Sequence, residues 1–580
     1  MASPSSLSPP EIPMELHAVN RKKLLDSFRE HLSRSSRPLS GFVFLQGGEE
    51  QTRHCTDHIE LFRQESYFAY LFGVQEPGFY GAIDIASGES LLFAPRLPAD
   101  YAVWLGEIKS LSYFKERYMV SSTYYTDEIT KVLHHQYQGP GKPPLYLLHG
   151  LNTDSNNFSK PADFEGIDNF KTDLNTLHPV LTECRVLKSA LEISLIQFAN
   201  DISSEAHVEV MRKAKVGDTI SLGLVAISLG HVAVSLSCCP CFVNSALSFT
   251  RRSNIQSALR RLFSLLLHLL LLLLQCLASC QLGVLCIESQ QNEIMSFGVS
   301  ETDPNHDQYL SNKPNVNTLE DGDMALLDMG AEYHFYGSDI TCSFPVNGKF
   351  TRDQSLVYNA VLRAHNAVIS SMRPGVSWVN MHKLAERIIL ESLKEGHLLS
   401  GDVDAMVHER LGAVFMPHGL GHLLGIDTHD PGGSGKTQRT WFEVSAHLSR
   451  ELLEGMVITV EPGCYFIDAL LLPAMENTQT SKYFNHDQIS RFRGFGGFGL
   501  KAMWIAIVFK NQLSSAWSYL ELTLLFLDLL SVIDMMYVTC DGCVNMTKCP
   551  REIQEIEAVM AGAPWPIKKI SIPSSVNGKT

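Results

Sequence analysis

Residues 326–344 read Leu-Leu-Asp-Met-Gly-Ala-Glu-Tyr-His-Phe-Tyr-Gly-Ser-Asp-Ile-Thr-Cys-Ser-Phe, and ten residues separate Asp328 from Asp339. Both aspartates have apolar or β-favouring neighbours, and two glycines lie between them. Two adjacent strands would let both carboxylates point into one pocket. A buried pair of like charges is costly without cations between them, so the segment predicts a metal site. Taken alone, it is equally compatible with two unrelated surface aspartates.

A second stretch brings three histidines into a glycine-rich, otherwise apolar run. It reads Phe415-Met-Pro-His-Gly-Leu-Gly-His-Leu-Leu-Gly-Ile-Asp-Thr-His-Asp430, with His418, His422 and His429 at spacings of four and seven. Neutral imidazole is a common metal ligand and a good proton shuttle. A lone histidine in such a run is usually a core residue with a hydrogen-bond partner, but three at these spacings favour a functional site.

A third stretch, Gly455-Met-Val-Ile-Thr-Val-Glu-Pro-Gly463, predicts an apolar strand that ends at Glu461. Glu-Pro-Gly is by itself a common turn. Combined with two aspartates and a histidine, however, Glu461 completes an oxygen-rich site that suits Mn²⁺ or another first-row divalent ion. Two such ions can bind one water, lower its pKa and stabilise a tetrahedral intermediate, which is the chemistry of amide hydrolysis.

In this order the three motifs resemble the signature of the pita-bread superfamily, which comprises methionine aminopeptidase, aminopeptidase P and prolidase. Five further segments resemble the prolidase (Xaa-Pro dipeptidase) family within it: Leu45-Gln-Gly-Gly-Glu-Glu50, Phe62-Arg-Gln-Glu-Ser66, Ser338-Asp-Ile-Thr-Cys-Ser-Phe-Pro345, Arg491-Phe-Arg-Gly-Phe-Gly-Gly497 and Asn545-Met-Thr-Lys-Cys-Pro-Arg551. The resemblance implies an α/β (α+β) protein with a creatinase-like N-terminal domain and a pita-bread metallopeptidase domain, usually in a homodimer.

The resemblance also implies an activity, the hydrolysis of dipeptides with a C-terminal proline by a water activated by two Mn²⁺ ions. An aminopeptidase P-type exopeptidase is the alternative within the same superfamily. Four of the family's five metal ligands match Asp328, Asp339, His422 and Glu461. His418 and His429 match the histidines that steady the substrate and the tetrahedral intermediate, and Glu461 matches the residue given the proton-transfer role.

The sequence departs from the family pattern at several site positions. Ile533 stands in the place of the fifth ligand, a glutamate, and the neighbouring Asp534 would face the opposite side of the strand. Ser531 and His447 stand where the family has arginines, and His306 lacks the family's surroundings for a substrate-side histidine. Because a lost ligand weakens metal binding, we predict low or no activity. A catalytically dead binding protein is the corresponding alternative.

The chain organisation predicted from these patterns has a disordered terminus at 1–14, a creatinase-like domain at 15–182 and a pita-bread domain at 183–570. Atypical segments at 218–313 and 498–531 interrupt the second domain and would fit a retained intron or a faulty gene model. The Leu-rich run at 262–286 is long enough to span a bilayer, so a membrane anchor is a further alternative.

Several elements are predicted within this organisation. Apolar runs predict strands at 41–46, 80–85, 90–93 and 144–148, and helical periodicity predicts helices at 16–32 and 183–216. Thr351 and Gln354 predict a capping box at the start of another helix.

The composition limits the remaining possibilities. The net charge of −15 argues against a general nucleic-acid binder. Residues 1–10 lack a basic start followed by an apolar core, so we expect no secretory signal and a cytoplasmic protein. Thirteen cysteines in 580 residues are too dilute for a disulfide scaffold and favour free thiols in a reducing compartment. The expected partners are dipeptide substrates and a second copy of the chain.

Overall fold

The computed structural model describes residues 10, 12–153, 155–217, 319–432, 450–492 and 534–566, with short segments at 298–299, 503–508, 521–526 and 530–532. Most of the two atypical segments, including the Leu-rich run at 262–286, therefore lies outside the described residues. Among the residues that are described, no helix has the length and apolar character needed to cross a bilayer.

The N-terminal domain is built on a six-stranded mixed sheet with the strand order β4-β3-β2-β1-β5-β6. The predicted strands and the first helix are confirmed, because each apolar run forms a buried strand and α1 packs its apolar face on the domain core. The strands are β1 (Phe42–Gln46), β2 (Tyr80–Asp84), β3 (Ser90–Ala94), β4 (Ser122–Tyr125), β5 (Pro144–Leu147) and β6 (Lys171–Asp173). The helices are α1 (Glu15–Arg34), α2 (Ser66–Phe72), α3 (Ala102–Leu105), α4 (Leu111–Arg117), α5 (Ile129–Gln136) and α6 (Leu177–Val186).

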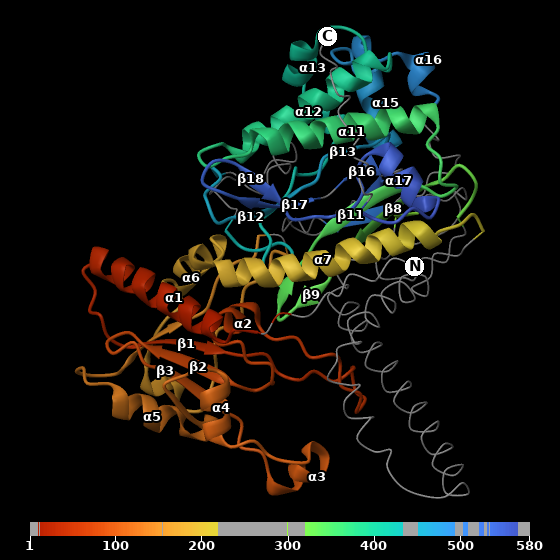
Figure 1. Cartoon of the computed structure of the whole chain (residues 1–580). Coiled ribbons are helices and arrows are strands. Elements are labelled where there is room, and N and C mark those ends of the chain that lie inside the picture. The colour runs from red at the N-terminus through yellow and green to blue at the C-terminus, as the bar shows by residue number, and fades with distance from the viewer. Residues whose placement is uncertain are drawn as a thin grey trace, which may run out of the picture.

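A long helix, α7 (Ala190–Lys213), lies between the two domains (Figure 1). The prediction of one continuous helix from 183 to 216 is wrong, because α6 ends at Val186 and a new helix starts at Ala190. The physical reason is a capping box, in which the Ser189 side chain accepts from the backbone N–H of Glu192 and the Glu192 carboxylate accepts from the backbone N–H of Ser189.

The second domain carries short antiparallel sheets beneath a pair of helices, α11 (Arg352–Ser371) and α12 (Trp378–Glu395), as Figure 1 shows. The predicted capping box is present, with Thr351 Oγ1 accepting from the Gln354 N–H at 3.2 Å and Gln354 Oε1 accepting from the Thr351 N–H at 2.8 Å. One large apolar core joins the sheets to α7, α11 and α12.

The rest of the second domain consists of short strands and helices. The strands are β7 (Gly298–Val299), β8 (Met324–Met329), β9 (Glu332–Tyr333), β10 (Tyr336–Gly337), β11 (Ile340–Pro345), β12 (Val457–Val460), β13 (Gly463–Cys464), β14 (Met503–Val508), β15 (Glu521–Phe526), β16 (Leu530–Ser531), β17 (Asp534–Val538) and β18 (Cys543–Asn545). The helices are α13 (Val403–His408), α14 (Gly412–Phe415), α15 (Asp468–Glu476), α16 (His486–Ile489) and α17 (Ile553–Met560).

Candidate metal centre

The two aspartates of the first motif lie at facing ends of an antiparallel strand pair. Asp328 is in β8 opposite Thr341 of β11, and Asp339 directly precedes β11. Oδ1 of Asp328 is buried and has no hydrogen-bond partner. Burial, and then the neighbouring carboxylates of Asp339 and Glu461, hold the pKa of the Asp328 carboxyl well above its usual range. A cation beside these carboxylates would offset the cost of burying their charges and would favour the ionised form of Asp328.

His422 reaches the same point from a loop that pairs with β12. Its Nδ1 donates to the carbonyl oxygen of Leu423 at 3.0 Å, so Nε2 is the ring nitrogen that faces the carboxylates and would bind a metal ion. That Nε2 lies 3.3 Å from Asp339 Oδ2 and 2.9 Å from Glu461 Oε1. Burial lowers the pKa of His422, but these two carboxylates raise it well above its ordinary value. A carbonyl acceptor on the second ring nitrogen is typical of metal-ligating histidines.

Glu461 follows the last residue of β12, and its backbone N–H donates to the carbonyl of Leu420 at 2.7 Å. Burial opposes ionisation, but His422 and the hydroxyl of Thr459 lower the pKa of Glu461 to about 2. One ligand atom each from Asp339, His422 and Glu461 lies within 4.8 Å of the other two. Together with the unpaired oxygen of Asp328, this donor set of carboxylates and one imidazole fits a hard or borderline divalent ion.

The other two histidines of the second motif lie beside this cluster. His418 Nδ1 donates to the carbonyl of Gly419 at 2.7 Å, so its Nε2 accepts from the hydroxyl of Tyr465 at 2.6 Å. Burial lowers the pKa of His418, which favours its neutral form. The rings of His422 and His429 are 4.1 Å apart. Tyr465 could not be predicted from the sequence, since a tyrosine three residues after Pro462 carries no signal of its own.

Asp534 points away from this cluster, as strand alternation predicts. Its neighbour Met535 faces the site, because the Met535 sulfur accepts from the backbone N–H of Asp339 at 3.4 Å. The Asp534 carboxylate instead accepts from Arg551 Nε at 2.9 Å and from Asn545 Nδ2 at 2.5 Å. His365 Nε2 also lies 3.1 Å from it. Asp534 is therefore part of a buried ion pair in this structure.

The structure does not describe the other positions at which the sequence departs from the family pattern. Ile533, His447 and His306 lie outside the described residues, and Ser531 is placed only as part of β16. The loss of the fifth metal ligand at Ile533 therefore stays a prediction from the sequence.

Comparison with known proteins identifies the family. Residues 17–146 match the model of the aminopeptidase P N-terminal domain, and residues 275–499 match metallopeptidase family M24. The Xaa-Pro dipeptidase of Homo sapiens is 40% identical over 556 residues, which cover 95% of this chain and 94% of that protein. The chain belongs to the Xaa-Pro dipeptidase family. The Mus musculus member is 39% identical over 568 residues, or 97% of this chain and 96% of its own length.

More distant relatives bear on the aminopeptidase alternative and on the fold. A probable Xaa-Pro aminopeptidase of Sordaria macrospora is 28% identical over 90% of this chain and 91% of its own, so the aminopeptidase alternative is less well supported than the dipeptidase family. Zn-substituted Escherichia coli aminopeptidase P, solved with product, is 22% identical and aligns with a TM-score of 0.62 over 96% of this chain and 100% of that one. Pseudomonas aeruginosa aminopeptidase PepP is 22% identical and aligns with a TM-score of 0.61 over 95% of this chain and 98% of that one. The predicted α/β architecture, an aminopeptidase P-type N-terminal domain followed by a pita-bread domain, is confirmed.

Proposed function

We propose that this chain is a manganese-dependent Xaa-Pro dipeptidase whose metal centre is formed by Asp328, Asp339, His422 and Glu461. The observation that carries the proposal is the convergence of the last three within 4.8 Å, beside the unpaired buried oxygen of Asp328. Its relatives named Xaa-Pro dipeptidase, similar over nearly the whole chain, support the substrate class. The substrates would be dipeptides with proline in the C-terminal half.

The chemistry that two bound Mn²⁺ ions would supply is a water of lowered pKa and a polarised peptide carbonyl. The protein's own groups are arranged for the accompanying proton transfers. Glu461 accepts a hydrogen bond from the Thr459 hydroxyl, which orients its carboxylate, and it would take up a proton released at the centre. His418 is held in one tautomer by Gly419 and Tyr465, which suits its Nε2 to accept one hydrogen bond at a defined position.

We further propose that catalysis is impaired, because the candidate replacement for the missing glutamate is not available. The Asp534 carboxylate is held by Arg551, Asn545 and His365. Moving it into the site would leave the charge of Arg551 without its buried partner, which is strongly unfavourable. This observation favours a second candidate function, a pita-bread protein that retains a weak metal site without turnover.

The remaining parts of the proposal concern the organisation of the protein. We propose a cytoplasmic homodimer in which 15–182 form the N-terminal domain and 183–570 the catalytic domain. The matched family segments at 17–146 and 275–499 support this division.

The deciding experiment measures bound manganese per chain by elemental analysis on the purified full chain, with Gly-Pro hydrolysis on the same sample. About two ions with turnover would support the dipeptidase and contradict the impairment. One ion without turnover would support the second candidate. No ion in the unmodified chain, at a level equal to that of a His422→Ala control, would overturn the metal centre itself.

A further inference from the structure

The hairpin that joins the two aspartates has a tip that is unfavourable for its residues. Strands β9 and β10 pair between Asp328 and Asp339, and His334 and Phe335 form the two-residue turn. Both tip residues have positive φ, 47° and 72°, as a type I′ turn requires. Such turns favour Asn and Gly, because other L residues lose free energy in the left-handed region. Contacts from outside the hairpin must therefore hold this tip in place.

One contact of the tip with the rest of the molecule is made by a histidine of the N-terminal domain. His17, in α1, is fully buried, and its Nδ1 lies 3.1 Å from the carbonyl oxygen of Tyr70. A carbonyl only accepts, so His17 Nδ1 carries the proton and its Nε2 is a bare acceptor. His334 Nε2 lies 2.9 Å from that atom and must be the donor. The contact therefore needs a neutral His17 with its proton on Nδ1, because protonation of His17 Nε2 removes the acceptor.

Little room exists for another arrangement of these rings. A Cβ at Gly73, the left-handed residue that ends α2, would lie 2.2 Å from His17 Nε2. Phe335 packs against the core of the N-terminal domain, and Tyr333 donates its hydroxyl to the carbonyl of Pro10 at 2.8 Å. The hairpin is thus docked on the N-terminal domain through its tip.

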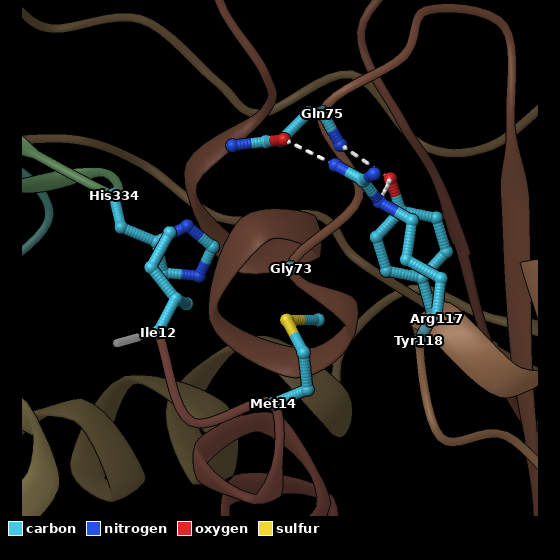
Figure 2. Close-up of a pocket in the computed structure, with 7 residues that line it drawn as sticks. All are labelled: Ile12, Met14, Gly73, Gln75, Arg117, Tyr118 and His334. Carbon is cyan, nitrogen blue, oxygen red and sulfur yellow. Dashed lines mark hydrogen bonds between the residues drawn. The ribbon is translucent and has the colours of Figure 1, made fainter. Parts of the chain in front are cut away.

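The surroundings of the two histidines disfavour a positive charge. His334 lies on the wall of a pocket of about 190 Å³. Figure 2 shows it with Met14, Arg117 and Tyr118 among the other lining residues. The positive charges of Arg21 on α1 and Arg117 on α4 act on His17 and His334 respectively, whereas the carboxylates of Glu76 and Glu332 are bonded to Tyr118 and Arg63. Burial and then His334 lower the pKa of His17 to about 3, and burial and then Arg117 lower the pKa of His334 to about 4.

We propose that His17 is a positioning residue for the metal centre, which holds the hairpin between Asp328 and Asp339 through His334 and releases it on protonation. The proposal rests on the metal centre of the proposed function. It assigns to the N-terminal domain a direct effect on the spacing of the two aspartates. The pocket beside His334 gives water, and hence protons, access to the pair.

The size of the effect follows from linkage. The docked state binds fewer protons than the released state, in which an unperturbed histidine has a pKa of about 6.5. Lowering the pH from 7.5 to 5.0 therefore raises the equilibrium constant for hairpin opening by about 30-fold through His17 alone. A purely structural contact between non-titrating groups would show no such pH dependence.

The test measures hydrogen exchange of the peptide 330–338 in the full chain by mass spectrometry, with labelling times scaled for the intrinsic pH dependence of exchange. The unmodified chain should show about 30-fold faster opening at pH 5.0 than at pH 7.5. The double variant His17→Gln with His334→Gln keeps hydrogen-bonding groups but does not titrate, so its opening should be independent of pH. His135→Gln, an exposed histidine of α5 in the same domain, is the matched control and should behave as the unmodified chain.

Manganese binding on the same samples tests the link to the centre. The double variant should retain Mn²⁺ to lower pH than the unmodified chain, with equal affinity at pH 7.5. Equal pH profiles for Mn²⁺ release, or pH-independent hairpin exchange in the unmodified chain, would overturn the positioning role. If the unmodified chain binds no Mn²⁺ at pH 7.5, both the proposed function and the positioning role are rejected. If it binds Mn²⁺ but releases it with the same pH profile as the double variant, only the positioning role is rejected.

Discussion

Replacing Arg551 by methionine should test the buried ion pair that holds Asp534 away from the metal centre. The Arg551 side chain is 12% exposed and the Asp534 side chain 1% exposed. Arg551 Nε donates to Asp534 at 2.9 Å, and its Nη1 donates to the carbonyl of Thr341 at 2.8 Å. The guanidinium therefore joins β17 to β11, the strand that follows Asp339.

The expected loss is about 3 kcal/mol in the free energy of unfolding, at the lower end of the range for breaking a buried pair. We expect the lower end because His365, 3.1 Å from Asp534, and Asn545 remain to stabilise the carboxylate. Replacing both partners, with Asp534→Asn and Arg551→Met, should cost at least about 1 kcal/mol less than the sum of the single changes.

The pH dependence has a definite sign. Burial opposes ionisation of Asp534, but Arg551 and His365 hold its pKa well below its usual range. A depressed carboxyl pKa stabilises the folded state above the unfolded pKa of about 3.9, and that stabilisation is lost as the pH falls below it. The difference in the free energy of unfolding between the unmodified chain and Arg551→Met should therefore reach its full size at pH 7. It should become smaller as the pH falls below about 4.

Urea unfolding of the metal-free chain, followed by circular dichroism at pH 7 and at pH 3.5, measures these quantities. Arg491→Met is the matched control, because Arg491 is 50% exposed and its pair with Asp353 lies at the surface, where such pairs contribute at most about 1 kcal/mol. The reasoning would be refuted if Arg551→Met lowered the free energy of unfolding as little as Arg491→Met does. It would also be refuted if the decrease did not change with pH.

Three other variants test the site and its support. His422→Ala should lower Mn²⁺ affinity by at least about tenfold, since it removes a proposed ligand whose Nε2 faces both Asp339 and Glu461, and calorimetric titration with Mn²⁺ checks this. Tyr465→Phe removes the donor to His418 Nε2 and should change the pH profile of Gly-Pro hydrolysis while leaving Mn²⁺ content unaltered; an unchanged profile would count against a role for this contact. Gly421→Ala should lower the free energy of unfolding by about 1–3 kcal/mol, because its Cβ would lie 2.1 Å from the Thr459 carbonyl oxygen, and a urea midpoint equal to that of the unmodified chain would contradict this.

Much of the candidate centre could be predicted from local sequence. Each proposed ligand lies at a fixed offset from a turn or strand end within its own motif, such as Glu461 directly before Pro462-Gly463. Strand alternation, a property of every β-strand, was enough to predict that Asp534 faces away from the site. The helix boundary at Ser189 also has a local sequence signal, the capping box that Ser189 forms with Glu192. The prediction did not use this signal because the apolar periodicity continues across the boundary.

The sequence by itself therefore determined the family, the two-domain architecture and the residues that converge on the centre, since these depend on short motifs and on periodicity. Only the tertiary structure decided which side chains pair across the molecule. His418 with Tyr465, Asp534 with Arg551 and His17 with His334 are separated by 47, 17 and 317 residues along the chain. The physical reason is that a hydrogen bond needs its two atoms within about 3 Å of each other, and packing of distant elements sets that distance.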